Sequence, residues 1–162
     1  MLKLVENLGH RHDLALADTL TLDFAERTRG RLRAVTDNGQ DAGLFLERGR
    51  VLQHGDVLRG EDGTLVGVRS RAEAVVVARA ADWPGFARAC YHLGNRHVPL
   101  QINDLVLRFK PDHVLEDLAR RLGLATSAEE APFEPDSGAY GNGPPHESRR
   151  ARPAHPPPSL SG

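Results

Sequence analysis

The stretch Tyr-His-Leu-Gly-Asn-Arg-His-Val-Pro-Leu-Gln, residues 91–101, carries the chain from a helix into a strand. Leu93 is the last residue of a helical apolar pattern, and Gly94 is the usual residue for a left-handed helix end. Residues 98–102 then have the character of a strand, with a proline near the start, where a missing N–H is tolerated. We therefore expect His97 on a short exposed connection. From there its imidazole can reach a metal ion, or a second copy of itself across a dimer axis.

The residues around this stretch alternate between strands and helices. Residues 74–78 are continuously apolar and β-branched at the centre, as in a strand buried on both faces. Asp82 caps a first helix, and a second helix begins at Pro111-Asp112 and stops at Gly123. Further strands are expected at residues 98–102, 105–110 and 124–133. The order is β-α-β-β-α-β, so residues 73–141 are predicted to form a ferredoxin-like domain.

Residues 1–72 are predicted to form a small all-β domain. From Leu14 to about Ser70, short apolar runs are cut by turn residues, and no stretch with a helical period interrupts them. Asn38-Gly39 is the strongest short hairpin signal in the chain. Strands this short and evenly punctuated indicate a barrel or a sandwich.

Four arginines fall at every second position of this domain, which on a strand would place them on one face: Arg27, Arg29, Arg31 and Arg33. One interpretation is a docking surface for an acidic partner. The other is the solvated face of an edge strand, which charge protects from pairing with another chain. The second interpretation is favoured.

Residues 142–162 are predicted to be a disordered tail. Six of the 11 prolines lie between residues 144 and 158, among Gly, Ser and Arg, with almost no apolar residues. Such a segment cannot bury enough surface to offset its ordering entropy. His146 and His155 lie on this tail, where they could fold back onto a bound ion.

Composition excludes several classes of function. A net charge of −1 provides no general field for nucleic acid or a membrane surface, and an aromatic content of 5% offers little base stacking. There is neither a membrane-spanning run nor a signal-peptide pattern, so a cytoplasmic location is expected. The single cysteine, Cys90, excludes an internal disulfide and a multi-thiolate zinc site, and its place on a core helix face predicts an inert thiol. No nucleophile elbow, phosphate loop or His-Glu-x-x-His pair is present, so the chain is not expected to be an enzyme.

Metal binding is the chemistry that the histidines allow. From spacing alone, His97 suits a turn residue and a ligand equally, and so does His113, which shares a helix face with Asp117. His92 is interpreted as a surface residue, and the amino-terminal histidines as solvated loop residues: His10, His12 and His54. One chain offers few ligands, whereas two His97 residues across a twofold axis supply two imidazoles. Imidazole and water ligands suit nickel, copper or zinc, with copper bound most tightly.

The stretch His-Leu-Gly-Asn-Arg-His-Val-Pro-Leu-Gln, residues 92–101, resembles the central motif of the UreE family, the urease accessory proteins that carry nickel. Three other stretches agree with it in the family's order: residues 42–58 (Ala-Gly-Leu-Phe-Leu-Glu-Arg-Gly-Arg-Val-Leu-Gln-His-Gly-Asp-Val-Leu), 112–118 (Asp-His-Val-Leu-Glu-Asp-Leu) and 132–141 (Pro-Phe-Glu-Pro-Asp-Ser-Gly-Ala-Tyr-Gly). Together these stretches are spread over residues 42–141.

The resemblance implies an amino-terminal β domain of the kind called peptide-binding, a ferredoxin-like metal-binding domain, and a homodimer. It implies that His97 of each protomer binds Ni(II) at the dimer interface, where Zn(II) or Cu(II) can also bind. The ion would pass to apo-urease through the accessory GTPase complex. His113 alone represents a stretch that holds a further histidine in some members, and the tail has only His146 and His155.

Two other functions are weighed against a nickel carrier. One is an interaction adaptor in a metalloenzyme assembly complex, whose β domain and arginines bind a partner while any metal is incidental. The other is a small metal-assisted hydrolase, which is disfavoured because no general base stands near His97 in the sequence.

Overall fold

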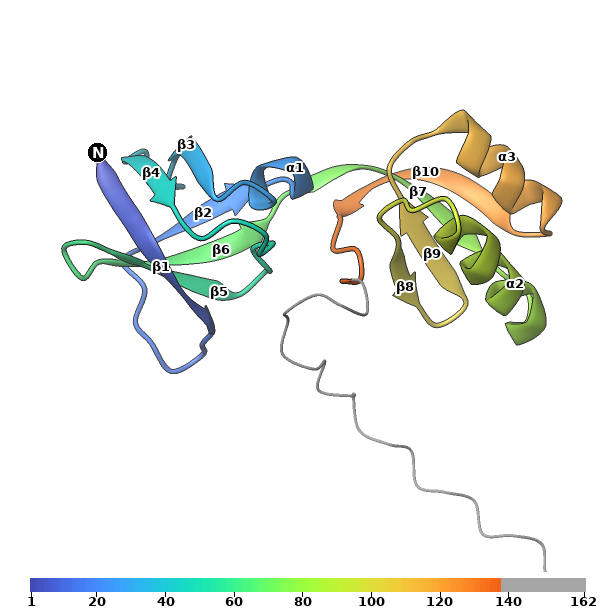
Figure 1. Cartoon of the computed structure of the whole chain (residues 1–162), viewed down its shortest axis with the longest axis horizontal. Coiled ribbons are helices and arrows are strands. Elements are labelled where there is room, and N and C mark those ends of the chain that lie inside the picture. The colour runs from blue at the N-terminus through green and yellow to red at the C-terminus, as the bar shows by residue number, and fades with distance from the viewer. Residues whose placement is uncertain (138–162) are drawn as a thin grey trace, which may run out of the picture.

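The computed structural model describes residues 1–137, which form two domains joined by a short connection between two strands (Figure 1). The amino-terminal domain is almost entirely β, and the carboxy-terminal domain combines a sheet with two helices. The predicted disordered tail at 142–162, with His146 and His155, lies outside the described residues.

The amino-terminal domain is a six-stranded, barrel-like sheet, which confirms the prediction of a small β domain. Its elements are β1 (Leu2–His10), β2 (Asp18–Leu22), α1 (Phe24–Arg27), β3 (Arg31–Val35), β4 (Asp41–Phe45), β5 (Asp56–Gly60) and β6 (Leu65–Ser70). The strand order is β2-β6-β5-β1-β4-β3, with parallel pairs β2·β6 and β1·β4 and antiparallel pairs elsewhere. Its core consists of Leu2, Leu4, Leu20, Leu22, Ala42, Leu44, Leu52, Leu58, Val66 and Val68.

Asp37 connects the two edge strands of this sheet. Its backbone N–H donates to Thr19 O of β2 at 2.8 Å, and the Thr21 hydroxyl donates to its carboxylate at 2.9 Å. Hydrogen bonds from the Thr19 and Thr21 hydroxyls lower the pKa of Asp37. Asp37 enters the predicted Asn38-Gly39 turn, in which Gly39 takes φ +90° and β4 follows β3 as its antiparallel partner. The hairpin prediction is confirmed, and the turn also draws the sheet edges together.

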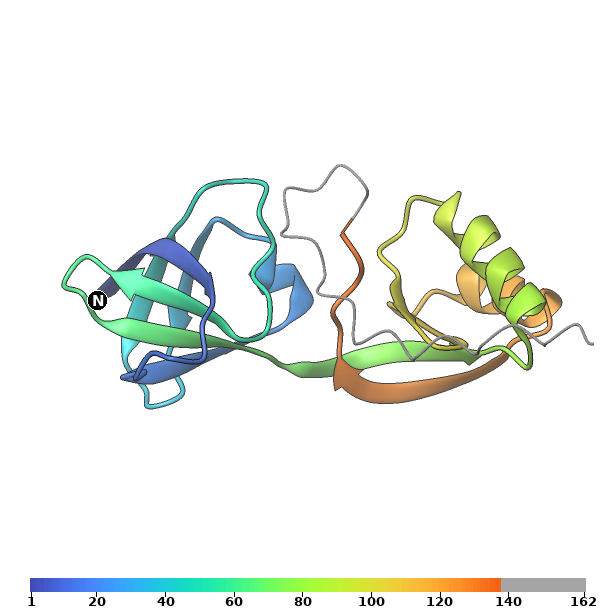
Figure 2. The same ribbon diagram turned by 90° about the horizontal axis from the view of Figure 1, so that it is seen from below.

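The carboxy-terminal domain has the expected β-α-β-β-α-β order. Its elements are β7 (Ala72–Arg79), α2 (Trp83–Gly94), β8 (Gln101–Asn103), β9 (Val106–Phe109), α3 (His113–Arg121) and β10 (Ala125–Pro132). The sheet order is β10-β7-β9-β8, and all neighbours are antiparallel. Both helices cover the same face of the sheet, as the view from below makes clear (Figure 2). The predicted cap at Asp82 is confirmed, since its side chain accepts the Gly85 N–H, and so is the helix start at Pro111-Asp112, where the Asp112 side chain accepts the N–H groups of Val114 and Leu115.

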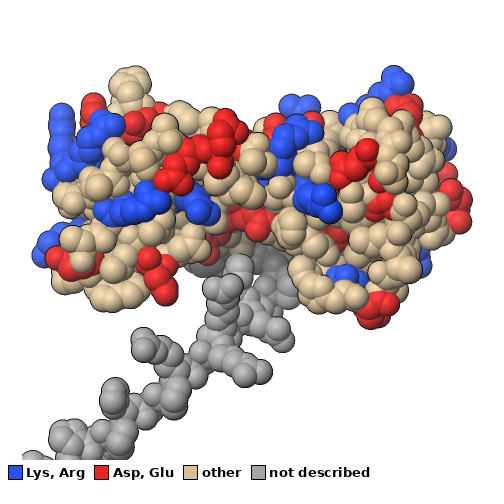
Figure 3. Space-filling model, turned by 180° about the vertical axis from the view of Figure 1, so that it is seen from behind, with Lys and Arg blue, Asp and Glu red and all other residues tan. Residues whose placement is uncertain are grey.

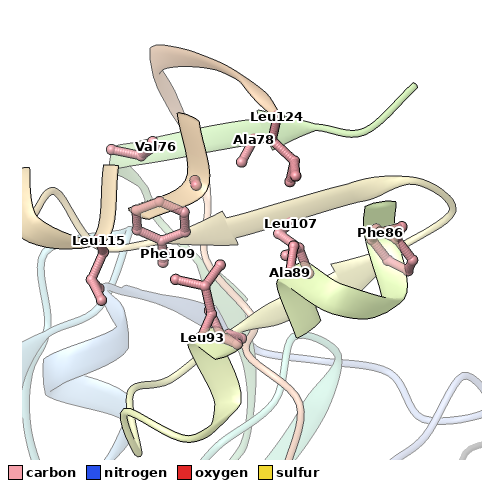
Figure 4. Close-up of a cluster of buried hydrophobic side chains, with 11 residues drawn as sticks. Val76, Ala78, Phe86, Ala89, Leu93, Leu107, Phe109, Leu115 and Leu124 are labelled. Carbon is pink, nitrogen blue, oxygen red and sulfur yellow. The ribbon is translucent and has the colours of Figure 1, made fainter. Parts of the chain in front are cut away.

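Strand β7 is buried on both faces, as its apolar sequence predicts. Val76 and Ala78 face the helices, where they join Phe109 and the buried faces of α2 and α3 (Figure 4). Val75 and Val77 point to the opposite face and pack against Phe133 and the partly buried Phe24. Alternate side chains of one strand therefore serve two different clusters.

Arg27 connects the two domains from a fully buried position, with an exposed fraction of 0%. Its guanidinium donates to Leu52 O at 3.0 Å and to Phe133 O, and it lies 3.9 Å from the Glu134 carboxylate. Desolvation by burial lowers the pKa of Arg27, while Glu134, Glu73 and Asp23 oppose that shift. Phe133 follows the last strand of the carboxy-terminal domain, so this one side chain joins sequence segments that are 106 residues apart.

The prediction of four arginines on one strand face is wrong. Arg27 ends α1 and is buried, Arg29 lies in the loop after it, and only Arg31 and Arg33 are exposed on β3. The cause is a local capping box, which starts a helical turn. The Glu26 N–H donates to the Asp23 carboxylate at 2.8 Å, and the Asp23 N–H donates to the Glu26 carboxylate at 2.9 Å. Strand β3 is an edge strand of its sheet, which agrees with the solvated interpretation for the two remaining arginines.

Three further details of the amino-terminal domain differ from the predictions. Helix α1 interrupts the strands, and β1 was not expected. Register shifts between Leu4 and Glu6, and again between Asn7 and His10, break the alternation by which β1 could have been found. The short apolar run at residues 51–52 forms a loop rather than a strand; there Leu52 packs in the domain core, and Arg27 O accepts its N–H at 3.0 Å.

The described surface carries mixed charge. On the face drawn in Figure 3, basic and acidic side chains are interspersed over both domains, in line with the net charge of −1. Within residues 1–137, no helix is long and apolar enough to cross a membrane.

Replacing Arg27 with methionine tests the connection between the domains. Arg27→Met keeps an unbranched side chain but leaves the buried carbonyls of Leu52 and Phe133 without a donor. We expect the free energy of unfolding to fall by about 3 kcal/mol, measured by urea denaturation. The matched control Arg33→Met removes only the exposed contact with Asp41 and should change stability by about 0.5 kcal/mol or less. Equal effects of the two substitutions would contradict the assigned role of Arg27.

Candidate metal centre

The candidate centre begins at the carboxyl end of α2. The helix buries Phe86, Ala89 and Leu93 on one face, which fixes it against the sheet. After the helix, Asn95 N donates to Tyr91 O at 3.1 Å, and His97 N donates to Gly94 O at 3.1 Å. These overlapping turns continue the helical winding up to His97.

His97 itself reverses the chain. It is one of two non-glycine residues in the described chain with positive φ, at +54°, whereas Gly94 is the last helical residue and has no positive φ. The expectation that Gly94 forms the left-handed helix end is therefore wrong, because the chain winds for two more residues, Asn95 and Arg96, before it turns at His97. A left-handed conformation raises the energy of any residue with a Cβ, so His97 adopts a backbone conformation that is unfavourable for a histidine.

The two sides of this turn are fixed by buried residues. Leu93 has an exposed fraction of 0% and Leu100 of 7%, while His97 between them is exposed. The predicted strand at 98–102 is shortened to β8 (Gln101–Asn103), so the connection is longer than expected. His97 is exposed on this connection, as the sequence predicted, and buried residues fix the connection at both ends.

His113 is the first residue of α3 and is exposed. The carboxylate of Asp117, which was expected beside His113, already binds Arg120. The Arg120 guanidinium donates to the Asp117 carboxylate at 3.0 Å and to the Glu116 carboxylate at 3.0 Å. A metal ion at His113 would therefore compete with an arginine for that carboxylate. A ligand role for His113 stays a prediction.

The other histidines differ in their surroundings. His92 is exposed on the last turn of α2 and its ring meets Tyr91 edge-on, with centroids 5.2 Å apart. His54 has a structural role that the sequence did not indicate. Its ring Nδ1 accepts from Ser70 N at 3.2 Å, and its backbone N–H donates to the Glu134 carboxylate at 2.9 Å. His10 ends strand β1 rather than lying in a loop, and His12 follows it.

A single chain does not assemble a multidentate centre in the part that the structure describes. Among residues 1–137, no three His, Cys, Asp or Glu side chains are grouped so as to hold a metal ion. Neither His97 nor His113 belongs to such a group within these residues, and His146 and His155 lie outside them.

Cys90 has the surroundings of an unreactive thiol. It is partly buried against the helix-covered core, and desolvation by that burial raises the pKa of its thiol. A neutral thiol is a poor nucleophile and a poor metal ligand, which agrees with the interpretation from sequence.

Comparison with known proteins identifies the class of molecule. Residues 1–71 match the family model described as the UreE urease accessory protein, N-terminal domain, and residues 73–156 match the corresponding C-terminal domain. The chain is thus built like an accessory protein of urease, a class distinct from the enzyme itself. It belongs to the UreE urease accessory protein family, as the four sequence stretches suggested.

Curated relatives agree over nearly the whole chain. The urease accessory protein UreE of Psychromonas ingrahamii is 50% identical over 141 residues, which cover 87% of this chain and 92% of the relative. That of Alkalilimnicola ehrlichii is 51% identical over 142 residues, covering 87% and 85%. That of Cupriavidus necator is 50% identical over 151 residues, covering 90% and 79%.

Substitutions at the turn test where the chain reverses. His97→Gly should be more stable than His97→Ala by about 1 kcal/mol in urea denaturation with chelator present, because only glycine takes a left-handed φ without a steric cost. Gly94→Ala is the matched control: the residue is helical and a Cβ there has no neighbour within 4 Å. It should raise stability by about 0.5–1 kcal/mol. The opposite pattern, with Gly94→Ala destabilising and the two His97 variants alike, would place the reversal at Gly94.

Proposed function

We propose that the protein is a non-catalytic, cytoplasmic Ni(II) carrier for urease assembly, and that it binds the ion between two copies of itself through His97 of each protomer. The observation that carries this proposal is the exposed imidazole of His97, held in a left-handed turn between the buried Leu93 and Leu100. Membership of the urease accessory family supports the proposal that this protein acts in urease assembly.

The arrangement of the carboxy-terminal domain supports this proposal. We assign it to the ferredoxin-like class, because its sheet order of fourth, first, third and second strand combines with two helices on one face. In this domain the sheet and α2 set the position of the His97 turn, so the imidazole is presented by ordered elements rather than by a long loop.

A twofold axis would resolve the shortage of ligands. One chain contributes a single imidazole at the turn, whereas two chains contribute a pair on equivalent backbones. Apolar side chains are exposed on the elements that carry the candidate ligands: Tyr91 of α2 has an exposed fraction of 66% and Val114 of α3 of 47%. Exposed apolar groups of this size are suited to burial against a second copy.

A pair of imidazoles completed by water suits a carrier rather than a storage site. Such a centre binds Ni(II), Cu(II) or Zn(II) and remains open on one side, so that the ion can be handed to the accessory GTPase and apo-urease complex. Asp136, near the end of the described residues, lies close to the turn, since its N–H donates to Leu100 O at 2.8 Å. We assign His113, His146 and His155 auxiliary roles as ligands.

Calorimetric titration of Ni(II), with molar mass measured by light scattering, tests the carrier. The wild-type protein should be a dimer that takes up one tightly bound ion, and His97→Ala should lose that ion while remaining a dimer. His92→Ala is the matched control, because His92 is exposed on the same helix end and should leave the titration unchanged. Substituting His113, His146 or His155 should weaken binding less than His97→Ala does. If wild type and His97→Ala titrate alike, His97 is not the ligand.

The second candidate is an interaction adaptor, which would bind its partner through the amino-terminal domain, where Arg31 and Arg33 are exposed on the β3 edge. It requires that binding to the urease assembly complex is the same with and without chelator, and in wild type and His97→Ala. The carrier requires transfer of nickel to apo-urease to fail in His97→Ala, measured as urease activation.

A further inference from the structure

A second pair of imidazoles lies on the amino-terminal domain. The Nε2 atoms of His10 and His12 are 2.8 Å apart, and their ring centroids are separated by 4.3 Å at an interplanar angle of 77°. Both side chains are exposed. The two nitrogens therefore meet at a point that solvent and ions can reach.

The His10 ring is held by the turn that precedes β5. His10 pairs with Asp56 of β5, and the neighbouring Gly55 has φ +86°. A Cβ at Gly55 would lie 2.3 Å from His10 Cε1 and 2.5 Å from Nδ1, so the ring rests against a backbone that only glycine leaves uncovered. The Asn7 amide donates to Asp56 at 2.8 Å and braces the end of β1 at the same place.

Arg11, between the two histidines, forms an ion pair with Asp13, which follows them. Arg11 donates to the Asp13 carboxylate through Nε at 2.8 Å and through a terminal nitrogen at 2.7 Å. This two-point contact lowers the pKa of Asp13 to about 2. Arg11 and Asp13 satisfy each other, and the imidazoles of His10 and His12 remain as the groups free to bind an ion.

The separation of the two nitrogens matches the spacing of adjacent ligands in a square or octahedral complex. Metal–imidazole bonds of about 2.0–2.1 Å that meet at a right angle place the nitrogens about 2.9 Å apart, whereas a tetrahedral angle places them about 3.3–3.4 Å apart. The observed 2.8 Å fits the first case. Square-planar and tetragonal geometries are those of Cu(II) and Ni(II), while structural Zn(II) sites are tetrahedral.

We infer that His10 and His12 form a bidentate surface site for Cu(II) or Ni(II), separate from His97 and on the other domain. Water completes the coordination, and a rotation of the exposed rings turns both lone pairs toward the ion. The site needs one chain only, so it does not depend on dimer formation or on the proposed role of His97.

Titration of Cu(II) into the full chain carrying His97→Ala tests this site without interference from the proposed interface centre. In that background, His10→Gln and His12→Gln each replace an imidazole with an amide that retains hydrogen bonding, so β1 should stay folded. Each substitution should remove the same single ion per chain, and the double substitution should remove no more than either one. His92→Ala in the same background is the control and should leave the stoichiometry unchanged.

Paramagnetic broadening provides a second readout. In the proton NMR spectrum of the same protein, substoichiometric Cu(II) should broaden the imidazole signals of His10 and His12 together and before those of His54 or His92. Unchanged Cu(II) stoichiometry in both glutamine variants, or loss with only one of them, would overturn the proposal. In that case the contact between the two imidazoles would be a hydrogen bond only.

Discussion

The buried guanidinium of Arg27 is the interaction on which the arrangement of the two domains depends. An arginine is costly to bury, and the cost is offset here by two backbone carbonyls and by the Glu134 carboxylate. The carbonyls of Leu52 and Phe133 belong to different domains, so the side chain stabilises both only when they are together. Glu73 adds a second connection, because its carboxylate accepts from Phe24 N at 2.7 Å and from Lys110.

The same junction continues to the turn that carries His97. After Phe133, Glu134 accepts from the Ser70 hydroxyl at 2.6 Å, and its backbone N–H donates to the Gln101 side chain at 3.0 Å. Asp136 then accepts from Ile102 N at 2.8 Å. Residues 133–136 therefore run along β8 from the domain junction toward the candidate metal centre. A structural change at the junction would therefore reach the turn through these hydrogen bonds rather than through a flexible loop.

The sequence predicted best where a local rule acts alone. The caps at Asp82 and Asp112, the stop at Gly123 and the turn at Asn38-Gly39 follow from the preferences of single residues. It failed where two rules compete. A capping box at Asp23 and Glu26 overrode the alternation of the arginines.

Two other failures have different causes. Register shifts concealed β1, as bulges remove the period by which a strand is found. The reversal at His97 had no signal, because a glycine three residues earlier satisfies the same rule. The candidate metal centre was proposed from the motif around His97 and not from geometry, since spacing along one chain cannot reveal ligands that a second chain would supply.

The link between the domains has a consequence for how such chains can change in length. Strand β6 ends at Ser70 and β7 begins at Ala72, so Arg71 alone separates two strands of different sheets. Side chains alternate along an extended chain with a period of two, and β7 serves a different cluster on each face. One inserted or deleted residue would exchange those faces and misdirect Val75 and Val77. We therefore expect insertions and deletions in homologous genes to gather in loops such as residues 46–55 and to avoid residues 70–72.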